Sequence, residues 1–185
     1  MATSAPQTQT RTTWTFDPAH TSIEFKVKHM MVTTVKGRFT EVEGKILGEL
    51  EDPALAEVDV QIKAASIDTR NEQRDAHLRS ADFLDAENYP TITFKSSRIE
   101  RTGQDTFKLT GDLTVRGTTR EVVLDTTVNG SGKTPFGTEV VGISAETFIN
   151  RKDFGLNWNV ALETGGWLVG DTVKIDLEIE AIKGS

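Results

Sequence analysis

The chain has 185 residues, a length that suits one domain with a continuous core. Its net charge of -7 offers no basic field to phosphate backbones, so nucleic acid is not an expected partner. The absence of cysteine excludes disulfides, thiolate metal sites and cysteine nucleophiles.

The N-terminal residues 1–13 are polar, rich in Ser, Thr and Gln, and lack apolar periodicity. We therefore predict a disordered tail, followed by one barrel domain over residues 14–185. The tail lacks the apolar run of a secretory signal, which predicts a cytoplasmic protein, or a periplasmic one if a signal has been removed. No segment reaches the roughly 18 apolar residues of a membrane span, so membrane contact would be peripheral and transient.

Apolar and polar side chains alternate with period two through most of the remaining chain. The alternating segments are 23–29, 36–49, 58–64, 91–99, 107–116, 120–129, 138–149 and 173–180. This pattern is typical of strands with one buried and one solvated face. About eight such strands are enough for an antiparallel sheet that closes on itself, so we predict an all-β protein with a single closed barrel. Residues 101–103 and 129–132 are predicted turns.

Residues 68–84 interrupt the alternation. This segment is charged, free of Gly and Pro, and places Ala76, Leu78 and Ala81 near one helical face. It predicts a short helix inserted between two strands as a lid or side brace, with Asp68 or Thr69 as its N-cap. A proline at position 90 then favours a return to extended backbone.

The inferred inward faces of the strands are almost wholly apolar but also carry small residues, namely Gly44, Gly48, Ala64, Ser96, Gly111 and Gly142. Small residues leave room for a ligand in an open barrel, but they also mark bulges and corners of a packed one. The pattern alone leaves both interpretations open. An open interior would suit an apolar chain, because about ten buried methylenes at about 0.8 kcal/mol each give micromolar affinity before ordering costs.

Few polar residues point to chemistry. His29 follows the apolar phase of its strand and is either a core histidine or a donor to a ligand head group, next to the adaptable Met30. Arg74 and Asp75 belong either to a solvated helix face or to a contact with an anionic head group. The three histidines lack metal-site spacing, so no metal or cofactor is expected. No nucleophile elbow or phosphate-binding loop is present, and we expect a protein that is not an enzyme.

Several segments together resemble the YceI-like family, whose members have a lipocalin-like barrel and several of which bind polyisoprenoid lipids. They include WTFDPAHTSIEFKVKH at 14–29 and RDAHLRSADF at 74–83, with shorter matches at 37–39, 66–69, 89–94, 111–117, 151–155 and 169–173. The resemblance implies that the barrel holds an isoprenoid lipid, such as a polyprenyl phosphate or an isoprenoid quinone, as a carrier, storage or sequestering protein. The expected ligand-binding residues are Phe25, Val27, His29, Met30, Phe39, Val60, Ile62, Leu78, Phe83, Phe94, Leu113, Phe148, Phe154 and Trp158.

Two alternatives stay open. The first is an enzyme acting on an isoprenoid-type substrate, with His29 or the pair Arg74 and Asp75 as acid and base, which requires titratable groups to converge inside the barrel. The second is a packed barrel that acts through its surface, for example as a homodimer joined by a strand edge or by the apolar face of the helix.

Overall fold

The described residues form eleven strands in one antiparallel sheet, and most of these strands lie within the alternating segments of the sequence. The computed structural model describes residues 11–185 of the chain. The strands are β1 (Thr13–Phe16), β2 (Ser22–His29), β3 (Thr33–Phe39), β4 (Val42–Leu47), β5 (Glu57–Lys63), β6 (Ile67–Asp68), β7 (Thr91–Arg101), β8 (Thr106–Val115), β9 (Thr118–Lys133), β10 (Glu139–Asn150) and β11 (Val169–Lys183). The helix α1 (Glu72–Arg79) and the 3-10 turns η1 (Pro18–His20), η2 (Pro53–Leu55), η3 (Ala64–Ser66) and η4 (Arg151–Phe154) complete the described elements.

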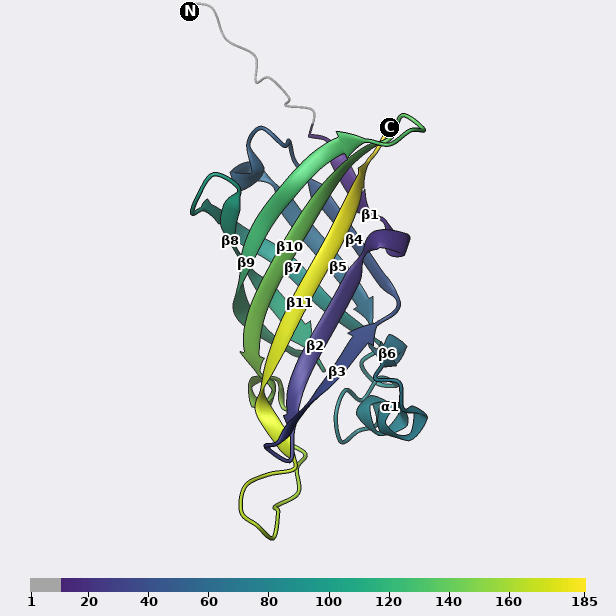
Figure 1. Ribbon diagram of the computed structural model, residues 1–185, viewed down its shortest axis with the longest axis vertical. Coiled ribbons are helices and arrows are strands. Elements are labelled where there is room, and N and C mark those ends of the chain that lie inside the picture. The colour runs from purple at the N-terminus through teal and green to yellow at the C-terminus, as the bar shows by residue number, and fades with distance from the viewer. Residues whose placement is uncertain (1–10) are drawn as a thin grey trace, which may run out of the picture.

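The sheet closes as a barrel (Figure 1). Its eleven strands amount to eight long ones, because three long strands are each interrupted once and so count as two. A 3-10 turn that begins with Pro18 separates β1 from β2, a break at Thr40 and Glu41 separates β3 from β4, and η3 separates β5 from β6. The last strand, β11, pairs with β10 along one edge and with both β2 and β1 along the other, which completes the ring. The predicted antiparallel barrel is therefore confirmed.

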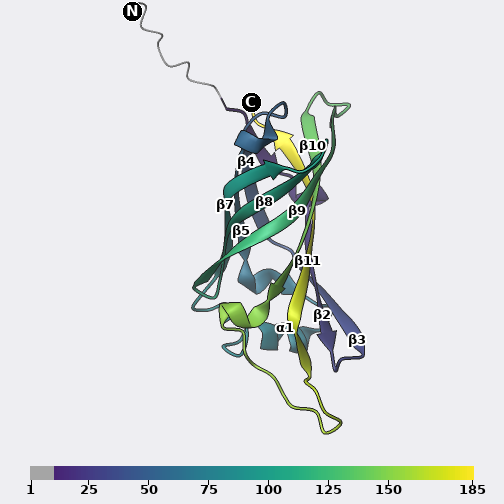
Figure 2. The same ribbon diagram turned by 90° about the vertical axis from the view of Figure 1, so that its left-hand side faces the viewer.

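The two ends of the barrel carry different connections. The strand β1 and the C-terminal end of β11 lie at one end, which we call the terminal end (Figure 1). The opposite end, which we call the helix end, carries α1, the β2–β3 turn and the long connection 151–168 (Figures 1 and 2). With eight residues, α1 is short, and no helix of the described residues is long and apolar enough to cross a bilayer.

The inserted helix is confirmed but is shorter than predicted, and its cap differs. Its N-cap is Asn71, whose side chain accepts a hydrogen bond from the backbone N–H of Arg74 at 3.0 Å. Asp68 instead accepts the N–H of Arg70, and Thr69 bonds to Asp75. Both predicted caps are thus used to fix the chain before the helix begins.

Two of the small inward residues make room for aromatic rings of the protein itself rather than for a ligand. A Cβ on Gly44 would lie 2.2 Å from the ring of Phe16, and one on Gly111 would lie 2.5 Å from the ring of Phe94. The prediction that Gly142 faces inward is wrong, because the inward positions of β10 are the odd-numbered residues. The β9–β10 register does shift between Gly142 and Ile143, as at a bulge.

The turn predictions have mixed outcomes. Residues 101–103 do open the β7–β8 connection, as predicted. The predicted turn at 129–132 is wrong, because these residues pair with β10 as part of β9, which continues to Lys133. The chain reverses at 134–137 instead. The predicted tail lies outside the described residues up to position 10, and Thr13 already belongs to β1.

Candidate functional site

The barrel encloses a cavity of about 430 Å³. Its wall follows from the strand period, because every second side chain of the long strands points inward. On β9, β10 and β11 these inward positions are Val122, Leu124, Thr126, Val128, Ile143, Ala145, Thr147, Ile149, Val173, Ile175, Leu177 and Ile179. A volume of this size lies within the range of pockets that hold small organic ligands.

The two threonines in this part of the wall do not make it polar towards a ligand. The hydroxyl of Thr126 donates to the carbonyl of Leu124 at 3.2 Å, and that of Thr147 donates to the carbonyl of Val123 at 2.8 Å. Because each hydroxyl proton is used by the sheet's own backbone, the wall presents mainly hydrocarbon to the cavity. Such a wall favours an apolar ligand without fixing its orientation.

Basic and imidazole side chains gather where the cavity reaches the helix end. Lys28 and His29 at the end of β2, and Arg74 and His77 of α1, all line the cavity there. Arg74 and Lys28 are also exposed to solvent, and we call this end of the cavity the mouth. Towards the terminal end, side chains of the β4–β5 connection line it instead, among them Pro53.

Arg74 is held at the mouth by Thr69. Its Nε donates to the Thr69 hydroxyl and its Nη2 to the Thr69 carbonyl, both at 2.8 Å. The buried carboxylate of Asp75 accepts from the N–H of Thr69 at 2.9 Å and also from its hydroxyl. Arg74 therefore faces the cavity with a positioned guanidinium, whereas Asp75 is not among the lining residues and does not pair with His29 inside the barrel.

An aromatic cluster joins the α1 segment to the connection 151–168 across the mouth. The ring centroids of His77 and Trp158 are 4.6 Å apart, and those of Phe83 and Trp158 are 5.4 Å apart. The ring nitrogen Nε2 of His77 also lies 2.8 Å from a carboxylate oxygen of Asp82. These contacts make the α1 segment and Trp158 a joint cover over part of the mouth.

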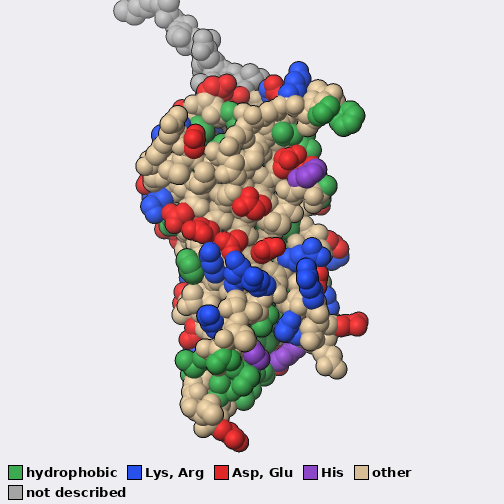
Figure 3. Space-filling view, viewed as in Figure 1, with side chains coloured by type: hydrophobic (Ala, Val, Ile, Leu, Met, Phe, Trp, Pro, Cys, Tyr) green, Lys and Arg blue, Asp and Glu red, His purple; other side chains and the backbone are tan. Residues whose placement is uncertain are grey.

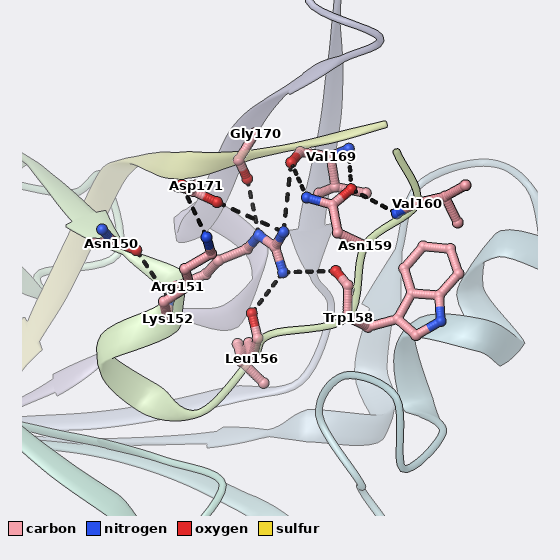
Figure 4. A network of polar contacts seen from close by, with 10 residues as sticks. All are labelled: Asn150, Arg151, Lys152, Leu156, Trp158, Asn159, Val160, Val169, Gly170 and Asp171. Atoms are coloured by element: carbon pink, nitrogen blue, oxygen red, sulfur yellow. Dashed lines mark hydrogen bonds and ion pairs between the residues drawn. The ribbon is translucent and has the colours of Figure 1, made fainter. Parts of the chain in front are cut away.

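A buried guanidinium fixes the base of this connection (Figure 4). Arg151, only 3% exposed, donates to the backbone carbonyls of Gly170 at 2.8 Å, Trp158 at 3.0 Å and Leu156. Burial lowers the pKa of Arg151, and the carboxylate of Asp171 at 3.8 Å opposes that shift. A fourth bond goes to the carbonyl of Val169 at 3.4 Å. Because four carbonyls from two segments converge on one side chain, Arg151 ties the start of β11 to the residues that carry Trp158.

Asn159 closes the connection just beyond this point (Figure 4). Its side-chain amide donates to the carbonyl of Val169 at 2.7 Å, and its side-chain oxygen accepts from the N–H groups of Val169 and Val160 at 2.9 Å. The tip of the connection, residues 160–168, therefore extends from a fixed base.

Most of the predicted ligand-binding residues line the cavity. Eleven do so, namely Phe25, Val27, His29, Phe39, Val60, Ile62, Leu78, Phe83, Phe94, Leu113 and Trp158. Whether they contact a ligand stays a prediction.

Three predicted residues lie elsewhere. Phe148 is 64% exposed on the outer wall near Lys174, since the inward phase of β10 falls on odd-numbered residues. Phe154 is buried in the core at η4 without lining the cavity, and Met30 stands in the β2–β3 turn, 45% exposed. The role of Arg151 was missed, because a buried arginine cannot be told from a solvated one by its neighbours in sequence.

These features define a lipocalin-like barrel with a ligand-sized apolar cavity and a mouth lined by basic and aromatic side chains. The chain belongs to the YceI-like family, since the model of the YceI-like domain matches residues 14–181. The UPF0312 protein SA2479 of Staphylococcus aureus is 39% identical over 170 residues, which cover 91% of this chain and 96% of that protein.

Solved structures agree with this assignment. The YceI protein of Campylobacter jejuni superposes with a TM-score of 0.72 at 33% identity, covering 86% of this chain and 91% of that one. A polyisoprenoid-binding domain from Saccharophagus degradans superposes with a TM-score of 0.69, covering 91% and 97% of the two chains. At 15% identity, that second likeness concerns the fold alone.

Proposed function

We propose that this chain binds one long isoprenoid lipid in the barrel interior and acts as its carrier, store or sequestering protein. The observation that carries the proposal is the cavity of about 430 Å³ with a hydrocarbon wall and polar groups confined mainly to one end. An amphiphile with a long apolar chain and a polar head matches this arrangement, with its chain against the hydrocarbon wall and its head at the polar end. The polyisoprenoid-binding domain with the same fold supports the choice of an isoprenoid chain.

The cavity wall accounts for affinity without specific polar contacts. Each buried methylene contributes about 0.8 kcal/mol, so a chain segment of about ten carbons contributes about 8 kcal/mol before ordering costs. That value corresponds to a dissociation constant near the micromolar range. Longer chains would gain affinity only as far as the cavity holds them.

The mouth favours an anionic head group such as a phosphate. The Nη1 of Arg74 has no hydrogen-bond partner among residues 11–185, while its other two nitrogens are fixed by Thr69. Lys28, His29 and His77 line the same end of the cavity. A phosphate placed there would receive charge-assisted hydrogen bonds from a preorganised guanidinium.

The first experiment is native mass spectrometry of the purified protein, with extraction and identification of any bound lipid, followed by uptake of a defined polyprenol. Ala145→Phe fills the cavity from β10 and is expected to reduce uptake at least about tenfold. Val123→Phe adds a ring at an exposed position on β9 and is the matched control, expected to bind as the wild type does. Equal uptake by both variants would contradict binding inside the barrel.

The head-group assignment has its own test. Arg74→Gln is expected to weaken binding of a polyprenyl phosphate by about tenfold, the value of one charge-assisted hydrogen bond, and to leave binding of the uncharged polyprenol unchanged. Arg70→Gln, on the exposed residue just before the helix, controls for lost charge. An equal loss for both lipids in Arg74→Gln would show that Arg74 supports only the structure of the mouth.

A further inference from the structure

Hydrophobic side chains gather around the outside of the mouth (Figure 3). They come from two loops, the β2–β3 turn and the tip of the connection 151–168. Met31 is 68% exposed, Val32 76% and Trp167 55%, with Met30 and Val160 also exposed. We call these five residues the rim. The loops touch, since a Cβ on Gly166 would lie 2.2 Å from the sulfur of Met31.

The segments that carry the rim are depleted in charge. Residues 28–36 and 155–170 contain only three charged side chains, Lys28, Lys36 and Glu163, although 26% of the chain is charged. The β2–β3 turn is also an unusual place for methionine, because Met30 and Met31 have φ of 51° and 63°. Glycine or asparagine would fit this backbone better, so turn geometry does not explain the two large apolar side chains.

A basic band lies on the barrel wall behind the rim (Figure 3). The sheet register places Lys174, Lys26 and Lys36 side by side on β11, β2 and β3. Asp176 lies within 3.4 Å of Lys26 and Lys174, while Lys36 has no ion pair among the residues that the structure describes. Lys26 precedes the end of β2 by three residues, or about 10 Å.

We infer that the rim docks on a lipid bilayer, so that the mouth opens directly into the membrane. This inference rests on the proposed function, because an apolar chain then passes between bilayer and cavity without crossing water. Peripheral membrane proteins insert apolar side chains, often with a tryptophan, into the boundary between headgroups and acyl chains. Their lysines lie one layer further out and contact the anionic headgroups. The rim and the basic band have this arrangement. Lys36, which has no ion pair among the described residues, gives the band a positive charge that matches an anionic lipid surface in a protein of net charge -7.

The test uses lipid-free protein and vesicle flotation, with phosphatidylcholine alone and with added phosphatidylglycerol. The wild type is expected to float, more strongly with the anionic lipid and less so at high salt. The double variant Met31→Ser with Trp167→Ser is expected to lose at least about tenfold in partitioning, because two large apolar side chains no longer leave water. Phe136→Ser is the matched control, since Phe136 is 94% exposed in the β9–β10 connection at the opposite end.

Depth gives a second readout. Lipids brominated on their acyl chains are expected to quench the fluorescence of wild-type protein on vesicles, and Trp167→Phe is expected to lose most of that quenching while keeping Trp14 and Trp158. Equal flotation of the double variant and the wild type, or equal loss in Phe136→Ser, would overturn the inference. A wild-type dimer at the concentration of the flotation assay, which Trp167→Ser dissociates, would also overturn the inference. The rim would then be buried against a second copy of the chain.

Failure of docking and failure of the proposed function give different results. The double variant Met31→Ser with Trp167→Ser is tested for uptake of polyprenol from detergent solution and from vesicles. If it matches the wild type in detergent but loses uptake from vesicles, the proposed function and the membrane docking are both supported. If wild-type protein binds the lipid in detergent but never floats, only the docking fails. If it floats but binds no isoprenoid from either source, the proposed function fails.

Discussion

Replacing Arg151 by methionine tests how the mouth is held. Methionine keeps much of the volume but removes the donors to the carbonyls of Leu156, Trp158 and Gly170. A hydrogen bond to a charged group contributes about 1.5–3 kcal/mol. The variant no longer has to bury a guanidinium, which offsets part of the loss of these bonds and of the weaker one to Val169. We therefore expect a decrease of about 3–5 kcal/mol in the free energy of unfolding, or roughly 6–20 °C in Tm for a chain of this size.

The assay is urea unfolding followed by circular dichroism, combined with hydrogen exchange of residues 156–170. Lys152→Met is the matched control, because Lys152 lies next to Arg151 in η4 and makes an exposed ion pair with Asp171 at 3.3 Å. Its expected cost is below about 1 kcal/mol. A loss below 1 kcal/mol in Arg151→Met, together with unchanged exchange in the connection, would refute the assignment of Arg151 as the tie of the mouth.

Two further predictions concern the barrel wall and one exposed ion pair. Gly44→Ala is expected to cost about 1–3 kcal/mol by thermal or urea unfolding, because its Cβ would meet the Phe16 ring at 2.2 Å, whereas Gly142→Ala, with nothing closer than 3.8 Å, is expected to be nearly neutral. The pKa of His20 is raised above 6.5, first by its hydrogen bond to Asp17 and then by Glu180. Protonated His20 therefore adds stability below about pH 6.5 that is lost as pH rises through the folded pKa, so His20→Gln should lower Tm more at pH 5.5 than at pH 8.5. An equal Tm difference at both pH values would contradict this.

The barrel could be predicted because its sequence signal is local. Period-two alternation fixes which side chains face inward, and it correctly placed residues such as Val27, Ile62 and Leu113 on the cavity wall. The same rule, applied strictly, would have excluded Phe148, whose even-numbered position on β10 faces solvent. That error arose from choosing an aromatic residue by type rather than by its phase.

The mouth could not be predicted in the same way, because its contacts join residues that are distant in sequence. The rings of His77 and Trp158 are in contact, although the two residues are about 80 positions apart in the sequence. Nothing in either segment alone indicates this contact. Whether the small wall residues left free volume was also undecidable, since Gly44 and Gly111 are filled by rings from other strands. Such outcomes depend on the three-dimensional fit of side chains, which composition does not determine.

An open cavity is compatible with a stable fold here because the closed sheet, rather than a packed centre, satisfies the backbone. The long strands pair around a closed ring, which β11 completes by pairing with β10, β2 and β1. The inward side chains that border an empty cavity lack dispersion contacts on that side. An apolar ligand supplies those contacts when it binds, and it therefore stabilises the folded state. Ligand binding should therefore raise the stability of the wild type, and Ala145→Phe, which supplies part of the missing contact permanently, should gain less from the same ligand. If added lipid stabilises both proteins equally, as measured by Tm, the ligand binds outside the barrel.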